Sequence, residues 1–366
     1  MIWLALPALT SIAYYLLVLA AAIKWQRRAP EKPAQLPAIS ILKPIRGRDP
    51  HFYEAIRSHA TQKYPCFEIL FGTGDPNDAA LKDIERLRSE FPRIAIEAVV
   101  VSTTAPNAKA GVLAELAKRA RYPLLLVNDS DIAVEPGYLE TVARTLERPG
   151  TGLVTCIYRA SAESAASRME ALGIATEFAP SVMVARLLGQ AEFALGSTML
   201  LRADTLRAAG GFEVLSEYLA DDYQLGKRVT DLGLKIEFAP FVVATDLGAA
   251  GWAQTWQHQV RWARTIRVSR PGGYYGYAVT HATPWALLAF AAGEWRIGAA
   301  AIAVRTAAGL ISALTLCDLA SAVRFWLIPV RDLFGFATWI AGLFGSSIHW
   351  RDRSLRLRRD GRISYR

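Results

Sequence analysis

Cysteine is scarce in this sequence. Three cysteines occur in 366 residues, at Cys66, Cys156 and Cys317, and they are far apart and odd in number. This spacing argues against a disulfide framework and offers no pattern of zinc ligands, and it is compatible with a reducing compartment. Internal repeats and low-complexity tracts are absent as well, so the chain is not a repeat protein.

Charge is missing from the first apolar run. Residues 2–23 contain no charged side chain, and a run of this length can span a bilayer. A cleaved signal peptide is the alternative, but such a peptide has a basic start, whereas the first charge here follows the run. We therefore expect an uncleaved transmembrane anchor over 1–24. The positive-inside rule puts the cytosol on the side of the basic residues that follow, which are Lys24, Arg27, Arg28 and Lys32.

Apolar residues make up 52% of the chain, which is high for a soluble protein, and the net charge is +9. A positive charge suits contact with anionic lipids or with an anionic substrate. The excess of basic residues that membrane proteins carry on their cytosolic side accounts for most of it. Nucleic acid is not an expected partner, because the basic runs flank membrane segments instead of an aromatic reading surface.

Strand and helix patterns alternate in the middle of the chain. A linker over 25–38, rich in proline and charge, leads away from the anchor. Short apolar strands and amphipathic helices then follow one another through a predicted cytosolic domain, 39–273. This alternation predicts an α/β, Rossmann-like domain with a mostly parallel sheet and right-handed crossovers. In such sheets the ligand lies beyond the carboxyl ends of the strands.

The segment 274–348 is predicted to return to the membrane. It contains three apolar stretches interrupted by charges, near 282–293, 297–317 and 325–346. The tail 349–366 is rich in arginine, so we expect it in the cytosol. The number of crossings between two cytosolic parts is even, so one stretch should be re-entrant or interfacial. Charges inside the membrane need partners, and Arg331 and Asp332 are expected to compensate each other locally.

Acidic residues stand at three chain positions where strands or loops end. Asp129 and Asp131 directly follow the apolar run 124–127, Asp75 follows another strand, and Asp222 comes near the start of a helical segment. Each has an ordinary explanation. Asp75 can form a turn and a helix cap, the pair can be a solvated loop end, and Asp222 can offset a helix dipole.

Together the three positions predict a catalytic centre. An Asp-x-Asp pair at a strand end can hold Mg²⁺ or Mn²⁺, which then bridges to substrate phosphates. An acid in a nucleotide pocket can accept hydrogen bonds from a base or a ribose, and a further carboxylate can deprotonate an incoming hydroxyl. These are the parts needed for glycosyl transfer from a nucleotide sugar, with the metal stabilising the departing diphosphate.

Arginine and tryptophan alternate along 252–270. The arginines are spaced by three and would form one cationic face of a helix; they are Arg261, Arg264, Arg267 and Arg270. An interfacial helix, with arginines on lipid headgroups and tryptophans at the boundary, is one interpretation. In the other, His258 and Arg261 point at the diphosphate of a substrate. The two are compatible.

Seven segments carry a further signal. They are ISILKPIRGRDP, FEILFGTGDPND, NAKAGVLAEL, LLLVNDSDIAVEPGYL, GSTMLLRADTLRAAGGF, YLADDYQLGKRV and HQVRW. In this order they resemble the motifs of membrane-anchored GT-A glycosyltransferases. More closely, they are similar to ceramide glucosyltransferases (glycosyltransferase family 2/21) and to their bacterial relatives in hopanoid biosynthesis. The likeness covers roughly 39–270 and the flanking membrane segments, and it implies a GT-A domain.

The resemblance also implies a role for each matching residue. Asp222 takes the position of the catalytic base, and Asp129 and Asp131 take those of metal ligands. The residues implied in nucleotide-sugar binding are Lys43, Asp75, Asn107, Lys109, Asp129, His258, Arg261 and Trp262. Two positions depart from the family pattern. The ceramide enzymes have Asp-Ser-Gly where this chain has Asp129-Ser130-Asp131, and His258 stands where glutamine or arginine is expected, which leaves its role open.

We therefore expect a metal-dependent, inverting glycosyltransferase, multi-pass in the bacterial inner membrane, that moves a sugar from a UDP-sugar to a lipid hydroxyl. The resemblance favours N-acetylglucosamine transfer to bacteriohopanetetrol, and glucose transfer to ceramide is the alternative. A processive polysaccharide synthase would need more membrane spans than the chain offers after residue 280. An inactive lipid-binding scaffold is the alternative outside enzymes, and the intact acids at all three sites argue against it.

Overall fold

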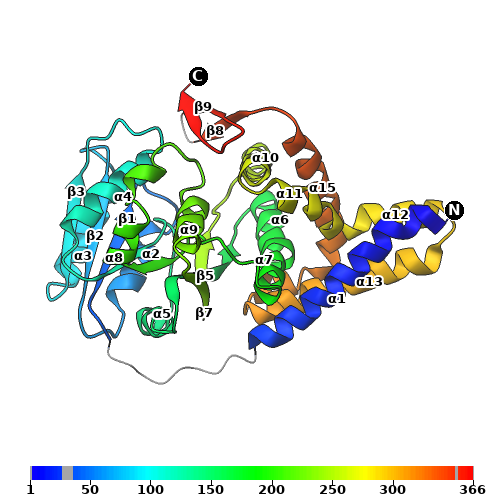
Figure 1. Ribbon diagram of the computed structural model, residues 1–366, viewed down its shortest axis with the longest axis horizontal. Helices are drawn as coiled ribbons and strands as arrows, with labels where there is room; N and C mark the ends of the chain where they lie inside the picture. The colour runs from blue at the N-terminus through cyan, green and yellow to red at the C-terminus, as the bar shows by residue number, and fades with distance from the viewer. Residues whose placement is uncertain (1, 27–35, 351–352, 366) are drawn as a thin grey trace.

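The computed structural model describes residues 2–26, 36–350 and 353–365 (Figure 1). Most of the predicted linker lies outside the described residues, as do Arg27, Arg28 and Lys32, to which the positive-inside argument was applied. The described chain forms an α/β domain, a group of apolar helices that projects from it, and a small sheet made by the C-terminal segment (Figure 1).

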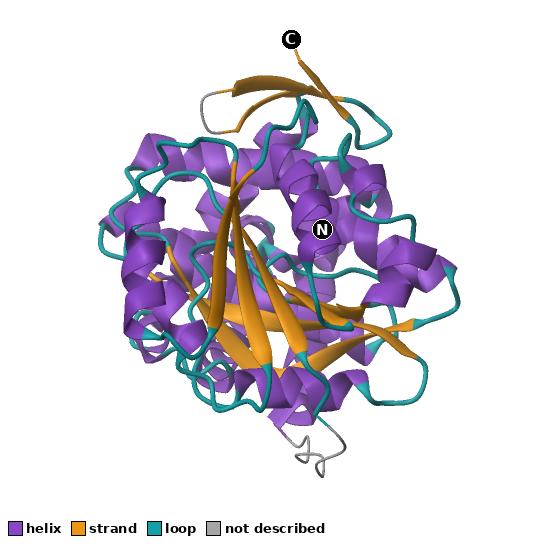
Figure 2. Ribbon diagram, turned by 90° about the vertical axis from the view of Figure 1, so that its left-hand side faces the viewer, coloured by secondary structure: helices purple, strands orange, loops and turns teal. Residues whose placement is uncertain are grey.

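A seven-stranded sheet lies at the centre of the described α/β domain (Figure 2). Its strand order is β3-β2-β1-β4-β6-β5-β7. Neighbouring strands are parallel except around β6, which runs antiparallel to both β4 and β5. The strands are β1 (Ile39–Pro44), β2 (Phe67–Thr73), β3 (Ala95–Val100), β4 (Leu124–Val127), β5 (Thr151–Ser161), β6 (Met199–Arg202) and β7 (Lys235–Asp246). The predicted mostly parallel sheet is confirmed.

Helices cover both faces of this sheet, which explains why β4 is apolar at every position. Leu124 and Leu126 belong to the core on one face, while Leu125 and Val127 belong to the core on the other. All four side chains are at most 2% exposed. The helices are α2 (Phe52–Ala60), α3 (Ala80–Glu90), α4 (Ala108–Arg119), α5 (Tyr138–Leu146), α8 (Ala203–Ala208) and α9 (Asp221–Asp231).

Three apolar helices, α1 (Leu6–Gln26), α12 (Ala282–Ala291) and α13 (Trp295–Thr315), pack side by side and project from the domain (Figure 1). Alanines fill the contact near the free end of this group, because a small side chain lets helices approach closely. Two helices of the described chain, α1 with its preceding turn and α13, are long and apolar enough to cross a membrane. With ten residues, α12 is only about 15 Å long.

Several helices connect the projecting group to the α/β domain. The chain between β5 and β6 forms α6, a π-helical turn and α7 in succession, and the chain after β7 forms α10 and α11. The bounds are α6 (Ala165–Gly173), the π-helical turn η2 (Ile174–Phe178), α7 (Ala179–Leu187), α10 (Trp252–Ser269), α11 (Pro271–Gly276), α14 (Leu319–Ala322) and α15 (Ile328–Leu343). Short 3-10 turns complete the described helical segments, at Ile2–Ala5, Glu213–Leu215, Tyr277–Thr280 and Phe325–Leu327.

The arginine-rich tail forms an antiparallel sheet of β8 (Ser347–Trp350), β9 (Arg353–Leu357) and β10 (Ile363–Tyr365). It packs on the α/β domain: Leu355 and Ile363 are buried against Leu219, and the Ile363 amide donates to the carbonyl of Glu217 at 2.7 Å. Figure 2 shows this small sheet apart from the large one. After the apolar helices, the chain therefore returns to the surface of the α/β domain.

The buried charges of α13 and α15 are paired across helices. Arg305 forms an ion pair with Asp332 at 2.7 Å, and both side chains are at most 1% exposed. Arg331 instead pairs with Glu177 of η2 at 3.0 Å. The expectation that Arg331 and Asp332 compensate each other is wrong, because adjacent residues on a helix point to different faces.

Removing Arg305 should therefore destabilise the helical region. In Arg305→Leu the Asp332 carboxylate stays buried and keeps only the hydrogen bonds from Thr283. Loss of one partner of a buried ion pair lowers the free energy of unfolding by about 3 kcal/mol or more. The check is the unfolding temperature of the detergent-solubilised protein. Arg296→Leu on the same helix is the matched control, since Arg296 is exposed, and it should leave that temperature unchanged; equal behaviour of the two variants would contradict the assigned role of the pair.

Candidate active site

Lys43 lies at the carboxyl end of β1, next to the start of the acidic loop that follows β4. Its side chain is fully buried, and its ammonium donates to the backbone carbonyl of Asp129 at 3.1 Å. Burial lowers the pKa of Lys43 to about 7, although the carboxylates of Asp131 and Asp129 act in the opposite direction. Lys43 therefore fixes the loop that carries both acids.

Lys109 of α4 joins two of the acidic segments. Its ammonium lies 2.6 Å from a carboxylate oxygen of Asp129 and 3.3 Å from one of Asp221. Burial acts to lower the pKa of Lys109, but the charges of Asp129, Asp221 and Asp222 outweigh it and raise that pKa. Lys109 thus stays protonated and holds the β4 loop against the start of α9.

Asp131 lies deeper on the same loop and accepts a hydrogen bond from the hydroxyl of Thr245 on β7. Burial, and then the neighbouring charge of Asp129, raise the pKa of Asp131 to about 6. Two carboxylates held together in this way attract a cation, and carboxylate oxygen is the ligand that Mg²⁺ and Mn²⁺ prefer. The pair fits a divalent metal on these grounds. No group of three or more histidine, cysteine or acidic side chains able to hold a metal occurs in the described residues.

Asp222 lies in the first turn of α9, beside the acidic loop. One carboxylate oxygen accepts from the backbone amide of Gly196 at 3.0 Å, and the other accepts from the amide of Tyr223 at 2.7 Å. Burial, and then the charge of Asp221, raise the pKa of Asp222 to about 6, against the lowering effect of Lys109. A carboxylate with a raised pKa is a stronger base than an ordinary one, and at neutral pH it is still deprotonated.

Gly196 connects the two acidic segments. Its amide binds Asp222, while its carbonyl accepts from the backbone amide of Asp129 at 3.3 Å. A side chain does not fit here, because a Cβ atom would lie 2.9 Å from a carboxylate oxygen of Asp129 and 3.3 Å from the ammonium of Lys109. The glycine therefore lets the loop that carries Asp129 and Asp131 approach the candidate base, Asp222.

Asn107 and Asp75 have the local roles that side chains of their kind often take. Asn107 caps α4 by accepting from the amide of Ala110, and its side chain donates to the carbonyl of Tyr218 at 2.8 Å. It is fully buried and fixes the segment before α9. Asp75 is exposed and accepts from the amide of Asn77 at 2.8 Å, as in an Asx-turn. Binding of a nucleotide sugar by either residue stays a prediction.

His258 and Trp262 lie on α10, which crosses beside α6. The ring of His258 binds a carboxylate oxygen of the buried Glu170 at 2.5 Å and packs against Trp262, with ring centroids 4.7 Å apart. Arg261 lies on the same helix and is half-buried. Sequence reasoning missed Glu170, since a single glutamate in a helix gives no signal until the fold brings it to a histidine. It also missed the contact of Asp221 with Lys109, which the two adjacent acids at the start of α9 could have indicated.

The remaining arginines of α10 bind the C-terminal end of α15. Arg264 donates to the carbonyls of Phe344 and Ser347, and Arg267 donates to those of Leu343 and Gly345. Cations at a helix C-terminus satisfy carbonyls that lack partners in the helix and offset its dipole. These two arginines are thus used inside the protein, whereas Trp252 and Trp256 of the same helix are exposed.

Comparison with known proteins identifies the family of this chain. Residues 3–363 match the family described as glycosyl transferase family 21. The chain belongs to this family. Ceramide glucosyltransferase 1 of Caenorhabditis elegans is 30% identical over 210 residues, which is 56% of this chain and 44% of that protein. Ceramide glucosyltransferase of Komagataella phaffii is 27% identical over 161 residues, 40% of this chain and 31% of that protein. The matches thus span less than half the length of these relatives.

A solved structure supports the fold assignment. The mannosyltransferase of Pyrobaculum calidifontis was solved in complex with GDP-mannose and Mn²⁺, and its match to this protein covers 93% of this chain and 99% of the mannosyltransferase chain. The TM-score is 0.56 and the sequence identity is 18%. This likeness shows the fold alone, and it confirms the predicted GT-A domain of the family 21 chain.

Gly196 offers a direct test of the site. In Gly196→Ala the new Cβ should displace the Asp129 carboxylate and the Lys109 ammonium. Because a shift of about 1 Å in an active-site group can cost much of the rate, kcat should fall by about tenfold or more. Glycosyl transfer by purified protein is the measurement, with the unfolding temperature as a check on folding. Gly276→Ala is the matched control, because a Cβ there has open space in the described structure. Full activity of Gly196→Ala would show that the close approach is unimportant.

Proposed function

We propose that this family 21 protein is an inverting glycosyltransferase that moves a sugar from a UDP-sugar to the hydroxyl of a membrane lipid. The observation that carries the proposal is the meeting of the acidic segments at one edge of the sheet. Asp129 is paired with Lys109 and hydrogen-bonded to Gly196, the amide of Gly196 donates to Asp222, and Asp131 follows on the same loop as Asp129.

Asp129 and Asp131 would hold the divalent metal, Mg²⁺ or Mn²⁺. When bound, the metal offsets negative charge on the leaving diphosphate. Two protein carboxylates leave room for substrate phosphates as further ligands, as is usual for Mg²⁺ sites. Lys109 contributes a second positive charge next to Asp129, and the side chains of Lys43 and Asn107 keep the loops around it in place.

Asp222 would remove the proton of the acceptor hydroxyl as its oxygen attacks the anomeric carbon. A single attack from the face opposite UDP inverts the anomeric centre and needs one base. The raised pKa of about 6 suits this role, because the group is deprotonated at neutral pH and basic enough to accept a proton. Arg261, His258 and Trp262 on α10 are proposed to contact the diphosphate or the acceptor.

A lipid acceptor is supported by the apolar surface of the helical region. Large apolar side chains are exposed along α1, α13 and α15, and two helices are long enough to span a bilayer. We propose that the protein is anchored in the bacterial inner membrane with its α/β domain in the cytosol. For the acceptor we propose a hopanoid polyol such as bacteriohopanetetrol, with UDP-N-acetylglucosamine as donor. Ceramide with UDP-glucose is the second candidate, and the names of the curated relatives favour it.

Measurement of UDP release tests the proposal. The detergent-purified protein is incubated with UDP-N-acetylglucosamine and bacteriohopanetetrol, or with UDP-glucose and ceramide, in Mg²⁺ or Mn²⁺. Release should depend on one lipid and should stop when EDTA removes the metal, because the charge on the diphosphate is then uncompensated. Release without any lipid requirement would contradict a lipid acceptor. The absence of release with every pair, from folded protein, would favour the scaffold alternative.

Asp222→Asn should abolish transfer while UDP-sugar binding persists, because asparagine keeps the shape but cannot accept the proton. In the unchanged protein kcat/KM should fall as the pH drops below about 6, where Asp222 becomes protonated. The pH profile and donor binding by calorimetry are the measurements. Asp231→Asn, at the far end of the same helix, is the control and should be active. Undiminished turnover in Asp222→Asn would remove Asp222 as the base.

A further inference from the structure

Residues 216–220, which we call the pre-α9 segment, lead directly into the helix that carries the proposed base. Asp222 follows them in the first turn of α9. The end of the chain pairs with this segment as one strand pairs with another: Tyr218 forms an antiparallel bridge with Arg362, the residue before β10. The C-terminal sheet therefore contacts the backbone close to the proposed base.

Three kinds of contact hold the C-terminal sheet on the pre-α9 segment. The amide of Ile363 donates to the carbonyl of Glu217 at 2.7 Å. Ile363 and Leu355 are buried together with Leu219. The ion pair between Arg362 and Glu217, at 3.3 Å, is about half exposed on both sides and adds little. The backbone hydrogen bond and the apolar packing therefore provide most of the attachment.

Helix α4 holds the pre-α9 segment from another direction. The backbone amide of Asn107 donates to the carbonyl of Ser216 at 2.8 Å, and its side chain donates to the carbonyl of Tyr218 at 2.8 Å. Lys109, on the same helix, lies 3.3 Å from a carboxylate oxygen of Asp221. The pre-α9 segment is thus fixed through its backbone by both α4 and the C-terminal sheet.

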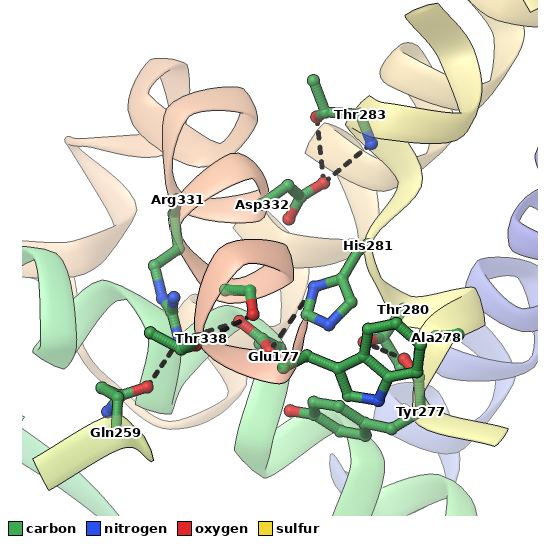
Figure 3. Close-up of polar contacts among 12 residues, drawn as sticks. Glu177, Gln259, Tyr277, Ala278, Thr280, His281, Thr283, Arg331, Asp332 and Thr338 are labelled. Atoms are coloured by element: carbon green, nitrogen blue, oxygen red, sulfur yellow. Dashed lines mark hydrogen bonds and ion pairs between the residues drawn. The ribbon is translucent and has the colours of Figure 1, made fainter. Parts of the chain in front are cut away.

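The other end of the C-terminal sheet is fixed to the helical region. β8 follows α15 after a short connection, whose carbonyls accept hydrogen bonds from Arg264 and Arg267 of α10. α15 itself is held by Arg331, which lies 3.0 Å from Glu177 and donates to the side-chain oxygen of Gln259 at 3.0 Å (Figure 3). The C-terminal sheet is therefore a strap between the helical region and the pre-α9 segment.

The strap has a small core that is separate from the two cores of the α/β domain. Its buried members are Leu219, Ile348, Leu355, Leu357 and Ile363, and four of these five come from the strap itself. The buried residue from the α/β domain is Leu219, three positions before the proposed base. The apolar packing of the strap therefore acts on the pre-α9 segment and not on the interior of the large sheet.

This attachment matters because a base has to lie within hydrogen-bond reach of the hydroxyl that it deprotonates. The carboxylate of Asp222 is oriented by the amides of Gly196 and Tyr223. It stands in the first turn of a helix, and helix ends are the parts that open most easily. A segment fixed just before that turn keeps the carboxylate in place.

We propose that the C-terminal sheet positions the catalytic base: through Leu219 and the bond from Ile363 to Glu217, it holds the pre-α9 segment and so Asp222. The inference rests on the proposed function, in which Asp222 deprotonates the acceptor. Ile363 is thereby a positioning residue, because it acts through Asp222 and not on the substrate.

Replacement of Ile363 by a charged residue is the first test. Ile363→Asp places a charge against Leu219 and should detach the strap, so that kcat falls by about tenfold while the dissociation constant and stoichiometry of UDP-sugar binding stay within about twofold. Ser364→Asp is the matched control. It adds the same charge at the next residue of β10, which points to the opposite face of the strand, and kcat should not change.

Hydrogen exchange measures the attachment without reference to turnover. In Ile363→Asp the amides of the pre-α9 segment and of the first turn of α9 should exchange faster, because their local opening is easier, whereas those of β4 should not change. If Ile363→Asp fails to fold, Ile363→Ala keeps an apolar side chain, and it should lower kcat by about threefold with a smaller change in exchange.

A reversible rescue separates positioning from a general loss of folded protein. Bridge partners such as residues 218 and 362 lie about 4.5–5.5 Å apart at Cα in antiparallel pairs, which suits a disulfide. Tyr218→Cys and Arg362→Cys are added to Ile363→Asp. Oxidation should return kcat to within about threefold of the parent value, and reduction should lower it again. The same protein without Arg362→Cys is the control for the native cysteines and should not respond.

The outcomes separate this inference from the proposed function. With an active parent protein, full kcat in folded Ile363→Asp would overturn the inference and leave the proposed function intact, and so would a disulfide that forms without restoring kcat. No transfer by the parent protein to any lipid would remove the proposed function and the catalytic part of the inference. Unchanged exchange of the pre-α9 segment would overturn the attachment itself.

Discussion

The candidate site depends on the attraction between one ammonium group and several carboxylates. Asp129, Asp221 and Asp222 lie close enough to influence the same lysine, and without Lys109 their mutual repulsion would separate the β4 loop from the start of α9. Burial, and then the charge of a neighbouring acid, raise the pKa of Asp222 and that of Asp131. The same repulsion prepares the site for a divalent cation.

The helical region solves a related problem in a different way. Its buried charges are neutralised in pairs that join distant segments: Arg305 with Asp332, and Arg331 with Glu177. Each pair links α15 to another helix, so the ion pairs also fix where that helix lies. The two sites differ in what remains unsatisfied. The sheet edge retains excess negative charge, which attracts a divalent cation, whereas the buried charges of the helical region are balanced in pairs.

Much of the α/β domain could be predicted because its signals are local. The alternation of apolar strands and amphipathic helices requires only a few neighbouring residues, and the abrupt change from Leu124–Val127 to two aspartates locates the ligand edge. The C-terminal sheet could not be predicted, because arginines dominate the tail. Its apolar residues, such as Leu355 and Leu357, form a core only by packing against Leu219, which is distant in the sequence. The partners of His258 and Arg331 could not be predicted from the sequence either. They are Glu170 and Glu177, respectively, and each is more than 80 residues away in the chain.

The sequence by itself determined the fold class, the family pattern and the three acidic positions, because each follows from residue type and short spacing. Only the tertiary structure decided which charges meet. It joined Asp129 to Asp222 through Gly196, turned Arg264 and Arg267 toward the end of α15, and enclosed Arg331 beside Glu177. Pairing of charges depends on distances across the fold, and a chain whose helices can pack in many ways does not carry those distances in its local pattern.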